Sequence, residues 1–238
     1  MSSLQNVKGG AVKLNSGYYI PLFGLGTYEL TGNEVKSAVN IALTCGYRLF
    51  DTAKYYKNEP ELGAALEHGL TRADVFITTK FHMDPEDPAG GARKLVLESL
   101  KQLRVSYLDM VLIHYPKAIK CDEKDTKNKE HRKLTYLELE KMKVLIEAFS
   151  SLARFEPALI QEPILTTLAK KNNVTIAVIL LSWAMSQGVG VIPKSSIPTQ
   201  LTENFEATKL VLKEEEIESL RKLNRNKNYI DCAGWRVL

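Results

Sequence analysis

The chain alternates between strand-like and helical runs along most of its length, and this alternation restricts the fold more than any other feature. Six short runs rich in apolar and β-branched residues are typical of buried strands; they span residues 22–27, 47–51, 75–80, 108–115, 144–150 and 189–195. Helical patterns lie between most of them, at residues 33–46, 92–103 and 175–188. Strand, helix, strand at this spacing predicts an α/β fold in which helices cover a parallel sheet.

Two parallel architectures compete for this pattern. A Rossmann-type sheet carries Gly-x-Gly-x-x-Gly after its first strand, and the segment GLGTYE from Gly24 supplies only the first two glycines. A barrel places its working residues at the C-terminal ends of several strands. Nearly every predicted strand ends in a polar or reactive residue, namely Asp51, Lys80, His114, Ser150 and Lys194. The pattern therefore favours a (β/α) TIM barrel, preceded by a hairpin around Asn15-Ser16-Gly17.

Composition excludes several other classes of protein. The 238 residues carry a net charge of +4 without a basic stripe, so nucleic-acid binding is not expected. Cys45, Cys121 and Cys232 lie far apart without CxxC spacing, which argues against a disulfide framework and a metal site. No apolar leader or membrane-length apolar run is present, so we expect no membrane association. These features together predict a cytoplasmic globular protein.

The residues at the strand ends suggest a chemistry. Asp51 is followed five residues later by Tyr56, and Lys80 and His114 end the next two strands. Each alone could be a cap, a packing residue or a structural ion pair, but four titratable residues at successive strand ends are more informative. Reduction of a carbonyl needs a proton donor, and a tyrosine with a pKa of about 10 needs a cation to stabilise its phenolate. Lys80 could be that cation, held by Asp51, while His114 orients the substrate oxygen.

Several motifs, in the same order, resemble those of the aldo-keto reductase family: IPLFGLGTY, GYRLFDTAKYYKNE, VFITTKF, YLDMVLIHYP and VIPKS. The resemblance covers nearly the whole chain. It implies an eight-stranded (β/α) barrel that reduces aldehydes and ketones to alcohols with NADPH, and a monomer acting on a small carbonyl substrate. By this resemblance Tyr56, not its neighbour Tyr55, is the proton donor. Asp51 and Lys80 tune that donor, and His114 positions the carbonyl.

The same resemblance assigns residues to the cofactor. Those implied to contact it are Gly26, Thr27, Asp51, Phe149, Ser150, Leu152, Lys194, Ser195, Glu203 and Asn204. Phe149 stands where the family has a tyrosine stacked on the nicotinamide, and stacking survives the exchange. Lys194 and Ser195 match the family residues that bind the 2′-phosphate of NADPH. The family's arginine six residues after Lys194 is Gln200 here, which offers phosphate no charged fork. We therefore predict a weakened preference for NADPH, so that NADH can also serve.

The chain is too short for the architecture that the resemblance implies. It shows six of the eight strands, and about 30 residues per strand–helix unit make a deficit of about two units. In the segment TYLELEKMKVLIEAFSSL (135–152), a helix start with Thr135 as cap and Glu138 in a capping box leads straight into a strand. No Gly, Pro or Asn separates the two. We interpret residues 1–238 as one domain with an internal gap near residues 142–146.

This gap leaves three functional hypotheses. Six strands either close with another stagger or leave a gap with two exposed edges, through which copies could associate. The chain is then an NAD(P)H-dependent carbonyl reductase, an impaired remnant that binds nucleotide or a partner chain, or an unstable product without a function. The family residues that hold the nicotinamide carboxamide have no counterpart in this sequence. The charged segment 116–134, expected as a surface loop, and the tail at 226–238 could border the site.

Overall fold

The computed structural model describes residues 3–67, 70–118, 121–122, 124–142 and 157–224. Its centre is a parallel sheet of four strands in the order β3-β4-β5-β6. These strands are β3 (Gly24–Gly26), β4 (Leu49–Asp51), β5 (Phe76–Phe81) and β6 (Met110–Ile113). All six side chains of β5 are buried, as expected for a strand covered on both faces. The first four predicted strands are therefore confirmed in type and place.

The last predicted strand lies on the other side of β3. Phe23 and Val191 form a parallel bridge, and the Gly24 amide donates to the Val191 carbonyl at 2.9 Å. The fifth predicted strand, at residues 144–150, lies outside the described residues. Within the described ranges no further strand pairs with β6, so this part of the sheet is an open arc running from the Val191 segment to β6.

Helix α1 (Asn33–Cys45) illustrates how the sequence pattern sets the packing. Its buried residues Val35, Ala38, Val39 and Ala42 recur at helical spacing and form one apolar face against the core. The helix ends at Gly46, whose φ of 111° lies in the left-handed region that favours glycine. The Gly46 amide donates to the carbonyls of Ala42 and Leu43 and so closes the last turn of the helix.

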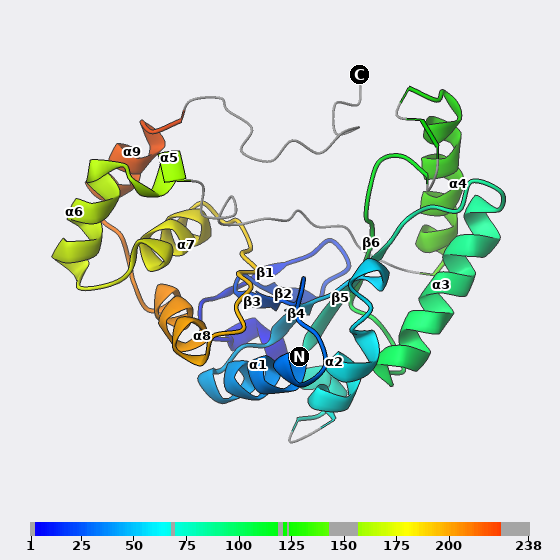
Figure 1. Cartoon of the computed structure of the whole chain (residues 1–238), viewed down its shortest axis with the longest axis horizontal. Coiled ribbons are helices and arrows are strands. Elements are labelled where there is room, and N and C mark those ends of the chain that lie inside the picture. The colour runs from blue at the N-terminus through cyan, green and yellow to red at the C-terminus, as the bar shows by residue number, and fades with distance from the viewer. Residues whose placement is uncertain (1–2, 68–69, 119–120, 123, 143–156, 225–238) are drawn as a thin grey trace.

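The remaining helices flank the sheet in two groups. They are α2 (Glu59–Leu66), α3 (Pro88–Leu103), α4 (Lys127–Lys141), α5 (Pro157–Ile160), α6 (Pro163–Asn172), α7 (Ile176–Ser186), α8 (Pro198–Phe205) and α9 (Glu214–Arg221). Figure 1 shows α3 and α4 on one side of the strands and α6, α7 and α9 on the other. Three-residue 3-10 turns lie at Lys54–Tyr56, Arg72–Asp74 and Glu206–Thr208, and a longer one at Ser3–Asn6.

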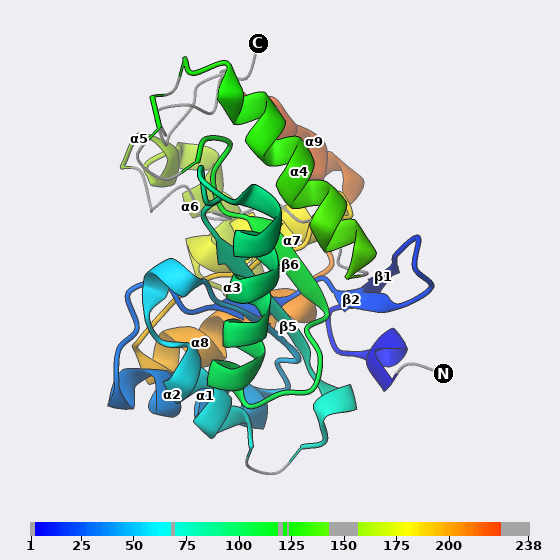
Figure 2. The same ribbon diagram turned by 90° about the vertical axis from the view of Figure 1, so that its right-hand side faces the viewer.

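The predicted hairpin is present and marks one end of the sheet. Strands β1 (Ala11–Lys13) and β2 (Tyr19–Pro21) pair antiparallel, and Figure 2 shows them beside the N-terminal residues at the margin of the molecule. Ile20 of the hairpin shares an apolar cluster with Leu49, Phe76 and Met110, which are the first residues of β4, β5 and β6. The hairpin thus covers the N-terminal ends of these strands and leaves their C-terminal ends for a site.

Two local predictions around α4 are wrong. This helix begins at Lys127, so the second half of the segment expected as a loop is helical. Thr135 is not a cap: it is buried within the helix, and its hydroxyl donates to the Pro88 carbonyl at 3.2 Å. Glu138 forms an ion pair with Arg93 of α3 instead of a capping box. Packing against α3 extends the helix beyond its local signals. It ends at Lys141 with Met142 as the C-terminal cap, and residues 143–146 of the expected gap lie outside the described residues.

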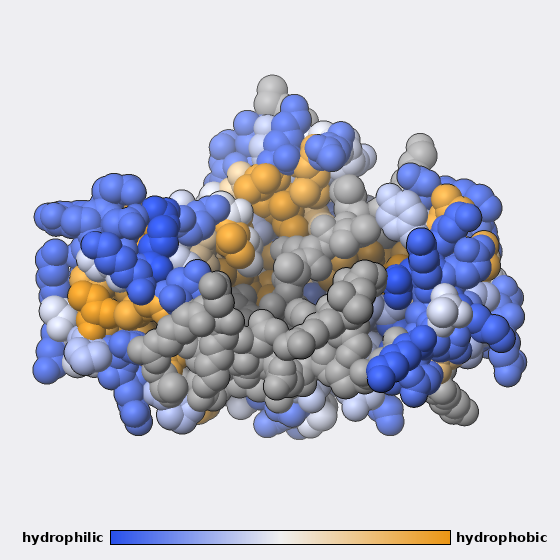
Figure 3. Space-filling view, turned by 90° about the horizontal axis from the view of Figure 1, so that it is seen from above, coloured by the Kyte–Doolittle hydropathy of each residue, from blue (hydrophilic) through white to orange (hydrophobic). Residues whose placement is uncertain are grey.

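The surface above the sheet is mixed in character. Figure 3 shows patches of hydrophobic side chains between flanks that are mostly hydrophilic. The main core lies below this face, where α1, α2 and α7 contribute Val39, Leu62 and Leu181 to one cluster with Leu25 of β3. A second cluster joins α6, α7 and α9. The apolar layer therefore follows the sheet and continues into the group formed by α6, α7 and α9.

Candidate functional site

The site begins with three side chains at the C-terminal ends of neighbouring strands. Asp51 is the last residue of β4, Lys80 is the penultimate residue of β5, and His114 follows β6. Thr78 of β5 pairs with Asp51, and Leu112 of β6 pairs with Lys80. The His114 amide continues the ladder by donating to the Phe81 carbonyl at 2.9 Å. Parallel strands in register thus bring the three predicted residues to one edge of the sheet.

Asp51 and Lys80 form a buried ion pair, as predicted. The Lys80 Nζ atom donates to both carboxylate oxygens of Asp51, at 2.6 and 2.7 Å, and to the Thr52 carbonyl at 2.8 Å. Each of the two charged residues is only 3% exposed. Burial raises the pKa of the Asp51 carboxyl, and the Lys80 ammonium opposes that rise. The lysine therefore has all three donors satisfied and a fixed position.

Tyr56 stands directly beside this pair. It ends the 3-10 turn Lys54–Tyr56, and its ring centre lies 5.0 Å from the Lys80 Nζ atom. The rings of His114 and Tyr28 both meet the Tyr56 ring edge-on, with ring centres 5.6 Å and 5.1 Å from its centre. Burial, followed by the Asp51 carboxylate and Tyr28, raises the pKa of the Tyr56 hydroxyl. Tyr56 therefore holds its proton at neutral pH.

His114 is a neutral imidazole at neutral pH. Its pKa is lowered to about 4, first by burial and then by the charges of Lys80 and His82. Its Nδ1 atom is buried without a hydrogen-bond partner among the described residues. The ring can therefore serve a bound molecule as a neutral hydrogen-bond donor, without bringing a second cation next to Lys80.

A buried network of polar side chains fixes the loop that carries Tyr56. Asn58 accepts a hydrogen bond from the Thr52 hydroxyl at 2.7 Å and donates to the carbonyls of Thr27 and Leu30, both at 2.9 Å. Asn58 occupies the N-cap position before α2, but its side chain makes no capping bond. Because these contacts join residues that are distant in the sequence, no local signal could have revealed them.

A second histidine lies beside the site and was missed by sequence reasoning. The His82 ring stacks on His114, with ring centres 5.0 Å apart and planes inclined by 17°. Tyr55 meets both rings edge-on, at 5.8 Å from His82 and 6.3 Å from His114. The only signal in the sequence was the place of His82, two residues beyond Lys80 at the end of a strand.

The residues predicted for the two ends of the cofactor lie next to each other. The Gly26 amide donates to the Pro193 carbonyl at 3.2 Å, which joins β3 to the segment carrying Lys194. A Cβ atom at Gly26 would lie 2.6 Å from the Ile192 carbonyl oxygen and 3.7 Å from the Lys194 Cβ, so only glycine permits this approach. Thr27 donates its hydroxyl to the Asp51 carbonyl at 2.9 Å. A continuous edge thus runs from Asp51 through β3 to Lys194.

The other predicted cofactor residues lie on or just before α8. Ser195 is buried, and its hydroxyl hydrogen-bonds the Gln200 side chain at 2.8 Å. Asn204 is buried and Glu203 is exposed on the same helix. Phe149, Ser150 and Leu152 lie outside the described residues, as do Cys232 and Trp235.

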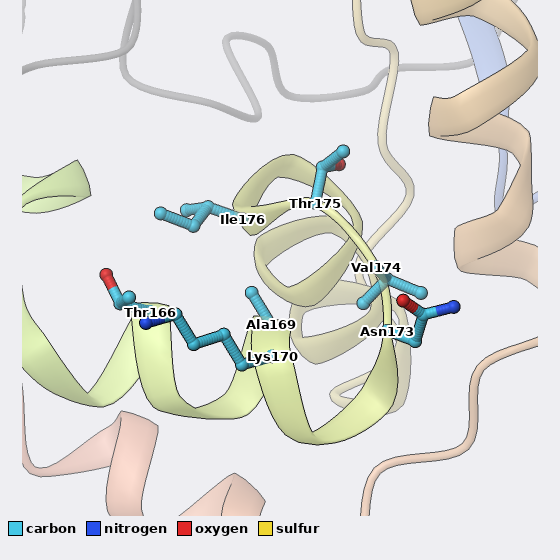
Figure 4. A pocket seen from close by; sticks show the side chains of 7 residues that line it. All are labelled: Thr166, Ala169, Lys170, Asn173, Val174, Thr175 and Ile176. Carbon is cyan, nitrogen blue, oxygen red and sulfur yellow. The ribbon is translucent and has the colours of Figure 1, made fainter.

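Other features of the described chain lie apart from this edge. A shallow pocket of about 430 Å³ between α6 and α7 is lined by Thr166, Ala169, Lys170, Asn173, Val174, Thr175 and Ile176 (Figure 4), none of which belongs to the site. Within the described ranges no group of three or more His, Cys, Asp or Glu residues could hold a metal ion. None of the described helices is by itself long and apolar enough to cross a membrane, although the sharply bent pair α6 and α7 meets that criterion when counted together.

Comparison with solved structures supports the fold. An aldo-keto reductase from a Medee basin deep-sea metagenome library superposes with a TM-score of 0.82 at 26% identity, covering 95% of this chain and 99% of that one. The aldose reductase of Schistosoma japonicum gives 0.73 at 27% identity, covering 92% and 93%. The architecture is thus that of the (β/α) barrel predicted from the sequence.

Comparison with sequences gives the same family. Methylglyoxal reductase DkgA of Escherichia coli O157:H7 is 30% identical over 261 residues, which cover 91% of this chain and 94% of the relative. Glyoxal reductase of Bacillus subtilis (strain 168) is also 30% identical, covering 90% and 93%. Since 91% of 238 residues is about 217, about 44 of the 261 aligned positions in the first comparison have no counterpart here.

The family model is matched in two blocks. The Aldo/keto reductase family model matches residues 22–155 and again residues 120–225, and the two blocks overlap over residues 120–155. Together the two blocks cover most of the 238 residues. The chain therefore belongs to the aldo/keto reductase family, whose members are oxidoreductases that reduce carbonyl groups with a nicotinamide cofactor.

Proposed function

We propose that this chain reduces aldehydes and ketones to alcohols, with Tyr56 as the proton donor. The observation that carries the proposal is the cluster at the strand ends. Lys80 is fixed by both oxygens of Asp51, and its Nζ atom lies 5.0 Å from the ring centre of Tyr56, which His114 meets edge-on at 5.6 Å. A protonated phenol, a fixed cation and a neutral imidazole are the groups that a developing alkoxide needs.

Each residue has a role that follows from its surroundings. The Tyr56 hydroxyl gives its proton to the substrate oxygen, and the Lys80 ammonium stabilises the phenolate that remains. Asp51 holds Lys80 in place, since both of its carboxylate oxygens accept hydrogen bonds from the ammonium. The His114 imidazole donates a hydrogen bond to the same substrate oxygen and orients the carbonyl. The chain thereby separates proton transfer, at Tyr56, from orientation, at His114.

The described residues fit a phosphorylated dinucleotide, which supplies the hydride when it is bound. Lys194 is exposed, forms no ion pair within the described ranges, and lies four residues before the start of α8. A lysine beside a helix N-terminus is suited to phosphate. We assign Gly26, Thr27 and Asp51 to the nicotinamide end and Lys194 with Ser195 to the 2′-phosphate. We assign Asn204 and Glu203 to the adenine end of the dinucleotide.

Three further cofactor contacts are predicted from the sequence alone, namely Phe149, Ser150 and Leu152. Because Gln200 stands where an arginine would bind phosphate, we propose use of NADPH with a weakened preference over NADH. The monomeric state, the absence of nucleic-acid and membrane partners, and a cytoplasmic location remain expectations from composition.

A second function is favoured by the missing segment. About 44 positions of a full-length relative have no counterpart, and the described sheet is an open arc. Displacement of the nicotinamide by about one ångström can lower the rate of hydride transfer by about a hundredfold. The alternative is therefore an impaired protein that binds the dinucleotide, or a partner chain at its open edge, without turnover. We favour the enzyme because the residues proposed for proton transfer all lie on or shortly after strands of the described sheet.

One titration distinguishes these functions. NADPH is added to the purified chain while tryptophan fluorescence is followed, and methylglyoxal is then added while the nicotinamide absorbance is recorded. We expect saturable binding followed by loss of absorbance. Binding without turnover would support the alternative function. A chain that neither binds nor melts cooperatively would be an unstable product, and the proposed function would be wrong.

A further inference from the structure

His82 adds a second imidazole at the place where the carbonyl is expected. It follows β5 directly, is half-buried, and stacks on His114 with ring centres 5.0 Å apart. His114 in turn meets Tyr56 edge-on at 5.6 Å. The order Tyr56, His114, His82 therefore places His82 one ring further from the proton donor than His114.

The ring nitrogens of this pair are available to a ligand. Among the described residues neither nitrogen of His82 has a hydrogen-bond partner, and neither is among the buried unpartnered atoms. In His114 the Nδ1 atom is buried and has no hydrogen-bond partner among the described residues. The accessible nitrogen of this ring is therefore Nε2. The packing of Tyr55 against both rings involves ring edges and uses no polar atom. Each imidazole thus keeps one hydrogen-bonding position for a molecule bound above the strand ends.

Both rings are neutral where the enzyme would work. Burial lowers the pKa of His82, and burial together with Lys80 and His82 lowers the pKa of His114 to about 4. A neutral imidazole carries one N–H donor. Two stacked neutral rings, with planes inclined by 17°, therefore offer one donor each without electrostatic repulsion between them. A site that needed only an apolar or aromatic wall would gain nothing from nitrogen at this position.

We propose that His82 is a specificity-determining residue that hydrogen-bonds a second oxygen on the carbon next to the reacting carbonyl. This inference rests on the proposed function. His114 takes the oxygen that is reduced, and His82 takes its neighbour, so the site favours α-oxoaldehydes and α-hydroxyaldehydes over simple aldehydes. A site built to hydrogen-bond a polar group discriminates against analogues that lack it, because the protein donor is then left unpaired.

Two substrates of equal carbon skeleton test this role. Methylglyoxal carries a second oxygen beside its aldehyde, and propanal does not. In His82→Phe, which keeps an aromatic ring and removes the donor, kcat/KM for methylglyoxal should fall about tenfold, the effect of one hydrogen bond. For propanal it should change less than about twofold. In His82→Gln, which keeps a donor and removes the ring, most of the preference for methylglyoxal should be retained.

The remaining outcomes each decide the proposal. NADPH affinity and the melting temperature serve as controls and should match the unaltered chain, because His82 has no hydrogen-bond partner in the described structure. An equal loss for both substrates would make His82 a packing residue and overturn its proposed role. An unchanged preference in His82→Phe would do the same. If the unaltered chain reduces propanal without preferring methylglyoxal, only this inference fails. If it reduces neither, the proposed function fails and this inference with it.

Discussion

The Lys80 ammonium donates to both carboxylate oxygens of Asp51, at 2.6 and 2.7 Å, in a site where each residue is 3% exposed. A buried ion pair contributes little net stability compared with a well-packed apolar pair, but the loss of one partner is costly. The pair is therefore better explained by chemistry at Tyr56 than by the needs of folding. This view makes predictions about stability as well as turnover.

Removal of one charge from the pair should destabilise the chain strongly. We expect Lys80→Met to lower the free energy of unfolding by about 3–5 kcal/mol, because the Asp51 carboxylate is left buried and unpaired. The double variant Lys80→Met with Asp51→Asn should lose less, since neither charge remains. Urea denaturation of the two variants measures both effects. Equal losses in the single and double variants would show that the charges are not coupled.

The network around Asn58 should position Tyr56. Asn58→Ala leaves the Thr52 hydroxyl and the carbonyls of Thr27 and Leu30 without their partner, at about 1–3 kcal/mol for each group left buried and unpaired. We expect a loss of about 2–4 kcal/mol in stability after partial rescue by water, together with a lower kcat. Asn40→Ala on the exposed face of α1 is the matched control and should stay within about 0.5 kcal/mol. Equal stability of the two variants in urea would contradict the role of the network.

The low pKa of His114 should make stability depend on pH. The pKa is about 4 in the folded chain, whereas an unfolded histidine titrates near about 6.5. Its contribution is fully present above about pH 6.5 and is lost as the pH falls towards about 4, because only the unfolded chain binds the proton in this window. His82 acts in the same direction.

In His114→Gln the decrease in stability between about pH 6.5 and 4 should therefore be smaller than in the unaltered chain. Thermal melts at several pH values measure the difference. His131 supplies the control, because His131→Gln removes an imidazole from a different element, α4. A pH dependence unchanged in His114→Gln would mean that this imidazole is protonated in the folded chain.

Cofactor preference should respond to one substitution in the first turn of α8. Gln200 accepts a hydrogen bond from Ser195 at 2.8 Å and carries no charge. Gln200→Arg adds a guanidinium near Lys194, so the ratio of NADPH to NADH affinity should rise by about tenfold or more. Fluorescence titrations with both cofactors measure the ratio. An unaltered chain that prefers NADPH as strongly as the arginine variant would refute the proposed weakening.

Much of the site could be predicted because strand ends are local features. Apolar runs that stop at Asp51, Lys80 and His114 mark the carboxyl ends of strands, and parallel pairing brings such ends together without further information. The same holds for α1, where periodicity and Gly46 determine both the buried face and the end of the helix. These elements obey local rules that tertiary packing does not override.

The rest depends on directions of side chains and on distant contacts. Thr135 has the residue type and spacing of a cap, yet α3 and α4 pack together and extend the helix through it. Asn58 precedes a helix, yet its side-chain amide donates hydrogen bonds to the carbonyls of Thr27 and Leu30, about 30 residues away in the sequence. The stacking of His82 on His114 likewise joins two strand ends and leaves no periodic trace. Each of these contacts joins residues that are distant in the sequence.

The central claim is that Tyr56 donates the proton, and removal of its hydroxyl tests this most directly. In Tyr56→Phe the rate of NADPH-dependent reduction of methylglyoxal should fall by about a hundredfold or more, the range of general acid catalysis. NADPH binding should persist in the same variant. Tyr136→Phe on the exposed face of α4 removes the same group elsewhere and should retain full activity. If Tyr56→Phe reduces methylglyoxal as fast as Tyr136→Phe, the proposed proton donor is wrong.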